Sequence, residues 1–339
     1  MKTNFILPIH NHNTYLNWDL SMLIETLQIF GLNALEPYKV DNAVIMAAGM
    51  ASRFAPLSFE KPKGLLNVKD EILIERQIKQ LRAVGITDIT LVLGYKHELF
   101  EYLAEMFNVK IIINHDFNRY NNTSTLMLVL DKLKNTYICS SDNYFTENVF
   151  HAYELHATYP VVQHDVSEAG EYYVNADADG KILDVVIGEG TWCMLGHVYY
   201  DRAFSTAFAE SLVREYEKLE TRENLWEKLY IQHIDAFDLR VKHYEDGVIR
   251  EFDALHELQQ FDSRYLEATD SPILNDIINT LNVTLRDIQD IEVVKDSSYP
   301  LAFTFTANGV AYLYEYRRNT CNHSPIINTT TTSWWFFYT

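Results

Sequence analysis

Residues 42–53 read NAVIMAAGMASR, and this stretch decides the fold. The apolar run at residues 43–46 is typical of a strand that is buried on both faces of a parallel sheet. Small residues and Gly49 follow it directly, so backbone N–H groups in the turn can approach a bound group closely. The spacing does not fit the G-x-x-x-x-G-K-[ST] phosphate-binding loop, and the absence of G-x-G-x-x-G disfavours a dinucleotide-binding fold of the usual kind.

Strands and helices alternate along the chain after this turn. Further apolar runs predict strands at 89–93, 109–113 and 136–139. Helical periodicity predicts helices at 72–84, 99–106 and 126–132. This alternation predicts an α/β fold with a doubly wound, mostly parallel, Rossmann-like sheet that carries helices on both faces. Ligands of such sheets lie beyond the carboxyl ends of the strands, which selects the turns after Met46, Leu93 and Cys139.

The pattern changes near residue 155 to shorter strands, which predicts a smaller mixed-sheet region that holds the second substrate. Strands are expected at 172–176, 182–187, 193–200 and 239–244, and a hairpin turn at 178–180. Residues 203–233 read as helical. Near the amino end, apolar residues between 20 and 30 predict an amphipathic helix that ends at Gly31.

The composition excludes several classes of protein. The 339 residues include 28 Lys and Arg against 47 Asp and Glu, a net charge of −19, and such a surface repels nucleic acid. Three cysteines lie far apart, at Cys139, Cys193 and Cys321, so neither a disulfide framework nor a zinc knuckle is indicated. No apolar stretch is long enough to span a membrane. We therefore expect a cytoplasmic protein with no nucleic-acid or membrane partner, and its oligomeric state is left open.

Arg53 and Lys63 are the candidate phosphate-binding side chains. They lie ten residues apart after the turn, a spacing at which they can straddle a polyphosphate. Residues 41–69 carry four cations and two acids, a local charge of +2 in a chain at −19, which favours an anionic ligand here. The alternative is an ordinary turn with solvated lysines.

Three acids are candidate ligands of Mg²⁺. Asp142 follows the strand at 136–139, which directs its carboxylate toward the same crevice. A carboxylate beside a triphosphate makes sense when a hard cation lies between them, and Mg²⁺ takes one or two carboxylates plus phosphate oxygens. Glu251 and Asp253 alternate on an extended segment, so both point to one side and supply the second acid. Taken singly, each acid reads equally as solvated surface.

Trp226 and Tyr230 lie at positions i and i+4 of a predicted helix, with Glu227 on the adjoining face. Aromatic rings flanked by carboxylates suit a quaternary ammonium group, because its nitrogen has no N–H to donate. Trp192, on a predicted strand, can supply a further wall. The alternative is packing of an amphipathic helix against the core, which composition alone favours.

Two groups of residues resemble known enzymes. Residues 47–53 with residues 60–63, which read EKPK, resemble the signature of nucleotidyltransferases that activate small phosphate esters with a nucleoside triphosphate. More narrowly, residues 41–53, 138–145, 194–197 and 251–253 resemble the bacterial CTP:phosphocholine cytidylyltransferase family, and the likeness extends over about residues 41–265.

This resemblance implies a magnesium-dependent reaction of CTP with phosphocholine that yields CDP-choline and pyrophosphate. It implies that the nucleotide is held by Ala47, Ala48, Gly49, Ser52, Tyr95, Asn122 and Ser124. Arg53 and Lys63 are implied as the catalytic cations on the phosphates. The implied metal-binding acids are Asp142, Glu251 and Asp253, and the implied choline cage is Trp192, Trp226, Glu227 and Tyr230.

The two ends of the chain depart from this pattern. Residues 1–40 resemble the end of a small winged-helix module, residues 41–265 form the expected catalytic domain, and residues 266–318 resemble the opening strands of a choline kinase. The segment lacks the glycine-rich turn of such a kinase, so no kinase activity is expected. Residues 319–339 fit no element pattern and are expected to be an irregular tail.

Two other functions remain open at this point. One is a cytidylyltransferase for a primary amine, such as phosphoethanolamine or 2-aminoethylphosphonate, because carboxylates serve a primary ammonium as well as a quaternary one. The other is a nucleotide-binding regulatory protein that has lost turnover.

Overall fold

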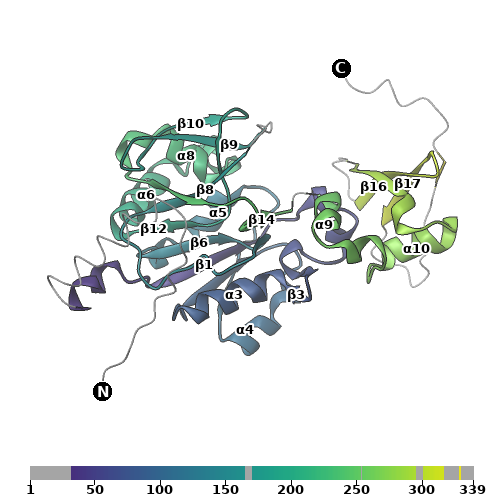
Figure 1. Cartoon of the computed structure of the whole chain (residues 1–339), viewed down its shortest axis with the longest axis horizontal. Coiled ribbons are helices and arrows are strands. Elements are labelled where there is room, and N and C mark those ends of the chain that lie inside the picture. The colour runs from purple at the N-terminus through teal and green to yellow at the C-terminus, as the bar shows by residue number, and fades with distance from the viewer. Residues whose placement is uncertain (1–31, 165–169, 253, 295–300, 317–327, 330–339) are drawn as a thin grey trace.

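A parallel sheet forms the centre of the molecule, as the alternation of strands and helices predicts (Figure 1). The computed structural model describes residues 32–164, 170–252, 254–294, 301–316 and 328–329. The parallel strands lie in the order β6-β1-β4-β5. Their bounds are β1 (Asn42–Ala47), β4 (Ile89–Leu93), β5 (Lys110–Ile113) and β6 (Thr136–Ser140). Because the strands that follow β1 lie on one side of it until β6 crosses to the other, the topological switch point lies between β1 and β6.

Helices cover both faces of this sheet, which confirms the doubly wound fold. On one face, α3 (Leu73–Ala83) and α4 (Tyr102–Phe107) pack against alternate residues of β1 such as Ile45. On the other, α5 (Asn122–Met127), α6 (Arg202–Glu215) and α8 (Trp226–Gln232) pack on the intervening residues such as Val44. The short segments η1 (Leu32–Tyr38), η4 (His97–Phe100), η5 (Leu130–Lys132), α7 (Leu219–Glu223) and η6 (Ile234–Ala236) complete this part.

The sheet continues beyond β6 as the expected mixed region, in the order β10-β9-β11-β8-β12. Its strands are β8 (Thr158–Gln163), β9 (Tyr172–Ala176), β10 (Ile182–Ile187), β11 (Trp192–Met194), β12 (Val198–Tyr200) and β13 (Arg240–Tyr244). The prediction of one strand at 193–200 is wrong, because Gly196, with φ of 96°, turns the chain between β11 and β12. β8 was not predicted, since Pro160 at its centre argues against a central strand.

A C-terminal module, residues 255–316, packs against the segment that follows the turn after β1. The module contains α9 (Leu255–Phe261), η7 (Ser263–Leu266), α10 (Pro272–Leu281), η8 (Leu285–Asp287), β15 (Ile288–Val293), β16 (Leu301–Ala307) and β17 (Val310–Tyr316), and β17 pairs with β18 (Asn328–Thr329). The segment contains η2 (Ser52–Phe54), α2 (Leu57–Glu60), η3 (Lys63–Leu65), β2 (Asn67–Val68) and β3 (Glu71–Ile72). One apolar core joins the two, and Phe59 meets Phe303 edge to face at 5.9 Å.

The resemblance of residues 266–318 to the opening strands of a choline kinase stays a prediction. The helix expected at 20–31 lies outside the described residues, as does the tail at 319–339 except Asn328 and Thr329. Within the described part of the chain, every helix is too short or too polar to cross a membrane.

Glu154 links β6 to β13 through a buried ion pair with Lys242 and a hydrogen bond from Tyr137. Lys242 of β13 donates to Glu154 at 2.5 Å, and the hydroxyl of Tyr137 of β6 donates to the same carboxylate at 2.6 Å. Burial alone would raise the pKa of Glu154, but Lys242 and His151 together hold that pKa far below its usual range.

We expect Glu154→Gln to lower the free energy of unfolding by about 3–5 kcal/mol at pH 7, because the nearly buried Lys242 ammonium loses its 2.5 Å ion pair with the carboxylate. A carboxyl whose pKa is lowered by folding stabilises the protein above its unfolded pKa of about 4.3 and loses that effect as the pH falls further. The difference between the two proteins in urea unfolding should therefore shrink below pH 4. Glu36→Gln, in an exposed pair with Lys39, is the control and should change stability by less than about 0.5 kcal/mol. An equal effect of the two substitutions would contradict the prediction.

Candidate active site

A cavity of about 390 Å³ opens at the carboxyl ends of β1 and β6, where the chain order of the sheet reverses. Its wall includes eight of the residues selected from the sequence: Ala47, Ala48, Gly49, Arg53, Lys63, Asn122, Asp142 and Glu251. The topological switch point is where such sheets bind ligands.

The turn after β1 leaves open space beside its backbone. A Cβ atom placed on Gly49 would meet nothing within 4 Å, so a bound group can approach the main chain there. Two residues later Ala51 adopts the left-handed conformation, with φ of 47° and ψ of 48°, and the chain then enters η2 with Arg53 exposed. The turn therefore presents backbone and a guanidinium group at the rim of the cavity.

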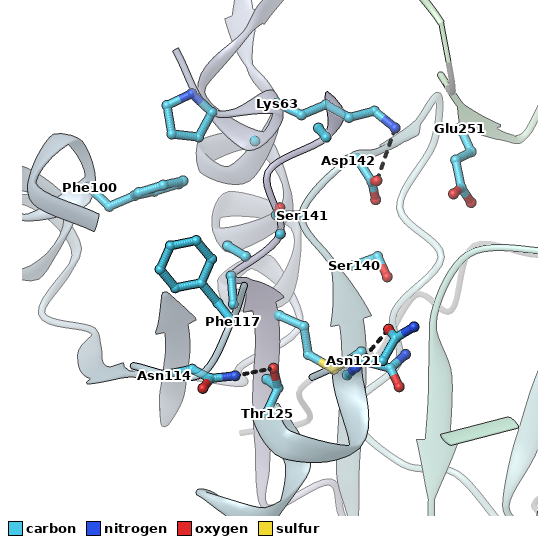
Figure 2. A pocket seen from close by; sticks show the side chains of 18 of the residues that line it. Lys63, Phe100, Asn114, Phe117, Asn121, Thr125, Ser140, Ser141, Asp142 and Glu251 are labelled. Carbon is cyan, nitrogen blue, oxygen red and sulfur yellow. Dashed lines mark hydrogen bonds and ion pairs between the residues drawn. The ribbon is translucent and has the colours of Figure 1, made fainter. Parts of the chain in front are cut away.

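Lys63 contacts Asp142 at one end of the cavity, although the two residues are 79 positions apart in the sequence (Figure 2). The Lys63 ammonium donates to Oδ2 of Asp142 at 3.0 Å, with 7% of the lysine side chain and 25% of the aspartate side chain exposed. Gly64 permits this approach, because a Cβ there would lie 2.9 Å from the Cβ and Oγ atoms of Ser141. Because little of either side chain is exposed, water screens their charges less, and the ion pair is stronger than one at the surface.

The second acid, Glu251, reaches the same rim through a short strand pair. β14 (Ile249–Glu251) pairs with β7 (Asn143–Phe145), which places Glu251 opposite Asn143. The amide of Asn143 donates to Oε2 of Glu251 at 3.2 Å. Figure 2 shows Glu251 beside the Lys63–Asp142 pair. The third predicted acid, Asp253, lies outside the described residues.

The donor set fits a hard cation. Oδ1 of Asp142 is buried and finds no hydrogen-bond partner among the residues that the structure describes. A carboxylate oxygen with that need, next to a second carboxylate, suits Mg²⁺, which takes few protein ligands and completes its shell with water and phosphate oxygens. Among the described residues, no group of three or more His, Cys, Asp or Glu side chains is arranged to hold a metal ion, so the protein would supply few of the ligands.

The wall opposite Lys63 is made by amide, hydroxyl and aromatic side chains. Asn114 follows β5 and donates to the hydroxyls of Ser124 at 2.9 Å and Thr125 at 3.1 Å. Asn121 caps α5 by accepting from the backbone N–H of Asn122 at 2.8 Å. Phe117 adds an aromatic ring to the wall (Figure 2).

Three of the predicted nucleotide residues stand behind or beside this wall. Tyr95 is 6% exposed and packs behind Phe117, with its backbone N–H bonded to the carbonyl oxygen of Ala48 at 3.0 Å. Ser124 is buried and donates to the carbonyl oxygen of Asn121 at 2.7 Å. Ser52 is exposed at the start of η2. In this conformation Tyr95 and Ser124 support residues that line the cavity.

Of the four residues of the expected choline cage, Trp226 and Tyr230 lie 6.4 Å apart between ring centroids, and Trp192 packs against the same apolar cluster. Trp226 and Tyr230 are 2% and 0% exposed, because the face of α8 that carries them packs into the core among Phe204, Phe208 and Phe237. Trp192 lies on β11, with its ring 4.3 Å from that of His243. The packing of an amphipathic helix therefore accounts for the two rings of α8.

Glu227 occupies a different position from its aromatic neighbours. It is half-buried, and its Oε1 accepts from the hydroxyl of Tyr159 at 3.3 Å. Its Oε2 is shielded from solvent and has no hydrogen-bond partner within the described ranges. Burial raises the pKa of this carboxyl to about 7, against the effect of hydrogen bonds from Tyr159 and from Asn122, which lines the cavity. A carboxylate with an unused oxygen at this place suits a cationic group.

The turn after β5 contributes Asn114 and Phe117 to the wall, and the sequence reading did not select it. The rule that selected the turns after β1 and β6 applies equally to the strand at 109–113. The selected turn after β4 is packed instead, since a Cβ on Gly94 would lie 2.6 Å from Cβ of Phe117 and 2.7 Å from the carbonyl oxygen of Ala48.

Comparisons with known proteins show which enzymes this chain is similar to. The family model described as nucleotidyl transferase matches residues 42–186. The chain is 29% identical over 222 residues to choline-phosphate cytidylyltransferase of Streptococcus pneumoniae, covering 65% of this chain and 96% of that protein. It is 31% identical over 232 residues to 2-aminoethylphosphonate cytidylyltransferase of Lancefieldella rimae, covering 66% of this chain and 93% of that protein.

Among solved structures, that of CTP:phosphocholine cytidylyltransferase from Streptococcus pneumoniae superposes with a TM-score of 0.63 at 29% identity. The match covers 66% of this chain and 97% of that structure. The match therefore includes nearly all of that structure but leaves about a third of this chain unmatched.

Proposed function

The chain belongs to the nucleotidyl transferase family, and from that premise we propose that it transfers CMP from CTP to phosphocholine, giving CDP-choline and pyrophosphate. One observation carries the proposal: Lys63, Asp142 and Glu251, from three distant parts of the chain, meet beside the open turn at Gly49 in one cavity. Relatives that share this region over nearly their whole lengths are cytidylyltransferases.

The proposed reaction requires the two substrates to be positioned and the negative charge of their phosphates to be neutralised. An oxygen of the acceptor phosphate is already anionic near neutral pH, so it attacks the α-phosphorus of CTP without a general base. The new bond joins that oxygen to the α-phosphorus, and the bond from the α-phosphorus to the oxygen that bridges to the β-phosphorus breaks, releasing pyrophosphate. Lys63 and Arg53 bind the phosphate oxygens and stabilise the charge that develops on them.

Asp142 and Glu251 would hold Mg²⁺. The bound ion supplies positive charge to the phosphate oxygens of the transition state. In the free protein, Lys63 occupies one oxygen of Asp142 and thereby keeps both side chains in place for the substrate. We expect the Lys63 ammonium to exchange this carboxylate for a phosphate oxygen when the nucleotide enters.

We assign the triphosphate to the side of the cavity with the Gly49 turn and Lys63, and the cytidine to the wall formed by Asn114, Phe117 and Asn121. Amide groups supply both donors and acceptors, which a pyrimidine edge and a ribose require. Phe117 offers a ring on which a base can stack.

The acceptor group is assigned to the side of Glu227. Its carboxylate attracts a cationic head group, and it accepts a hydrogen bond from the hydroxyl of Tyr159 at 3.3 Å. Burial, and after it the negative charge of Glu227, raises the pKa of Tyr172. Rings and one carboxylate suit a trimethylammonium group. A primary amine is the second candidate acceptor, because one relative is a 2-aminoethylphosphonate cytidylyltransferase. Oε2 of Glu227, which has no hydrogen-bond partner among the described residues, can accept a hydrogen bond from an ammonium group.

Glu227 gives the proposal a pH signature. Because the pKa of its carboxyl is raised to about 7, protonation competes with the cationic acceptor below that pH. We expect kcat/KM for phosphocholine to fall by up to about tenfold per pH unit below 7, in proportion to the ionised fraction. The phosphate of the acceptor itself titrates near pH 6, so Glu227→Gln is the control. That variant should have a raised KM and keep only the slope caused by the substrate; an unchanged pH profile would contradict the role of Glu227.

Initial rates of pyrophosphate release with phosphocholine, phosphoethanolamine and 2-aminoethylphosphonate test the choice of acceptor. The proposal predicts the highest kcat/KM for phosphocholine. Equal or faster turnover of either amine would replace choline with the amine. If the protein bound CTP and Mg²⁺ but released no pyrophosphate with any of the three acceptors, a nucleotide-binding regulatory protein would replace the enzyme as the proposed function.

We place this reaction in the cytoplasm. Cys139 and Cys193 are buried thiols, which suits a reducing compartment. Fractionation of cells that produce the protein tests this placement.

A further inference from the structure

The segment that carries Lys63 is held on both flanks by the C-terminal module. We call residues 57–69 the lysine loop. Three residues before Lys63, Oε1 of Glu60 accepts from the backbone N–H of Ile273 at 2.7 Å. Four residues after Lys63, the hydroxyl of Tyr265 donates to the carbonyl oxygen of Asn67 at 2.6 Å.

The Glu60 contact is made at the amino end of α10, a helix of ten residues that begins at Pro272. Backbone N–H groups in the first turn of a helix have no partner within the helix, and a carboxylate there both accepts a hydrogen bond and complements the helix dipole. Ser271 satisfies another of these groups by accepting from Leu274 at 3.1 Å. The Glu60 side chain therefore has a defined place, set by a helix of the module.

The main chain of Glu60 is held from the opposite direction. The Lys96 ammonium, in the turn after β4, donates to the carbonyl oxygens of Phe59 at 2.5 Å and Glu60 at 2.8 Å. Glu60 thus lies between the catalytic sheet on its backbone side and the module on its side-chain side. A shift of either support moves the start of η3, where Lys63 stands.

The polar contacts lie beside the apolar core that also joins the lysine loop to the module. A second cavity, of about 380 Å³, lies between the lysine loop and the module, with Glu60, Lys61, Asn67, Tyr265 and Ser271 in its wall. Glu60 and Tyr265, which make the two hydrogen bonds, both belong to this wall. Figure 1 shows α9 next to the main body of the molecule, with α10, β16 and β17 of the module farther from it.

We propose that Glu60 is a positioning residue: by anchoring the lysine loop to α10, its carboxylate fixes where the Lys63 ammonium stands in the cavity. This inference rests on the proposed function, because its readout is the transferase rate. It also assigns the C-terminal module a part in catalysis, although that module contributes no side chain to the described wall of the active-site cavity.

The test compares Glu60→Ala with Glu60→Gln and Asp287→Ala. A displaced catalytic group can cost up to about 10²-fold, so Glu60→Ala should lower kcat by roughly 10- to 100-fold at unchanged far-ultraviolet circular dichroism. Glutamine keeps an oxygen that accepts from Ile273, so Glu60→Gln should restore most of the rate. Asp287 caps η8 of the same module by accepting from the N–H of Thr284 at 2.7 Å, away from the lysine loop, and its substitution should leave kcat unchanged.

The decisive readout is the same substitution in a Lys63→Ala background, measured with radiolabelled CTP. If Glu60 acts through Lys63, then Glu60→Ala costs nothing further once the lysine is gone. An equal loss in both backgrounds, or a Glu60→Ala rate equal to that of Asp287→Ala, would overturn the inference. If Glu60→Ala does not fold, Tyr265→Phe removes only the second anchor and should show a smaller loss that also vanishes in the Lys63→Ala background. The wild-type rate separately tests the proposed function.

Discussion

Lys63→Ala should lower the rate of CDP-choline formation by about 10²–10³-fold, the usual cost of one preorganised charge-stabilising donor. The Lys63 ammonium is nearly buried in the cavity, where a charge acts through a lower effective dielectric than at the surface. Its effect is therefore expected mainly on kcat, because the charge that it neutralises develops in the transition state.

Lys61→Ala is the matched control for this substitution. Lys61 lies two residues away and carries the same charge, but it is exposed and lies in the wall of the second cavity. Its removal should leave kcat unchanged. Similar rates for the two variants would show that the net charge of the loop matters and that the position of Lys63 does not.

Asp142→Asn should lower the rate by at least about 10²-fold, because the charge of a bound metal ion is worth several kcal/mol in the transition state and each 1.36 kcal/mol is tenfold. The variant should also need a higher Mg²⁺ concentration for half-maximal rate, since an amide is a weaker ligand than a carboxylate. Titration of the rate with Mg²⁺ measures both effects.

Asp88→Asn is the control, because Asp88 is also an aspartate paired with a lysine, to Lys110 at 2.7 Å, but it precedes β4 at the amino end of the sheet. That variant should match the wild type in rate and in magnesium dependence. If Asp142→Asn lost activity but kept the wild-type magnesium dependence, Asp142 would only position Lys63, and the metal ion would bind at other residues.

The parallel half of the sheet could be predicted from the sequence because its signals are local. The apolar run of β1 ends at once in small residues, and the runs of β4 and β5 are separated by helices of ordinary length. The place of Asp142 followed from one topological rule, since it comes directly after the carboxyl end of β6. Lys63 lies sixteen residues beyond the end of β1, and it was selected by its charge and motif.

Other features depend on contacts between distant segments, which local patterns do not report. The spacing of Trp226 and Tyr230 shows that they share one face of α8, but not that this face turns toward the core. β8 contains Pro160 and is nevertheless placed in the sheet by its neighbours. Likewise, nothing near Glu60 in the sequence shows that its partner is Ile273, more than 200 positions away.

The most direct test of the central claim follows the phosphorus atoms. ³¹P nuclear magnetic resonance of the purified protein with CTP, phosphocholine and Mg²⁺ should show CDP-choline and pyrophosphate rising in equal amounts as both substrates disappear. Unchanged substrates, or release of orthophosphate from CTP while phosphocholine persists, would contradict a cytidylyl transfer site built from Lys63, Asp142 and Glu251.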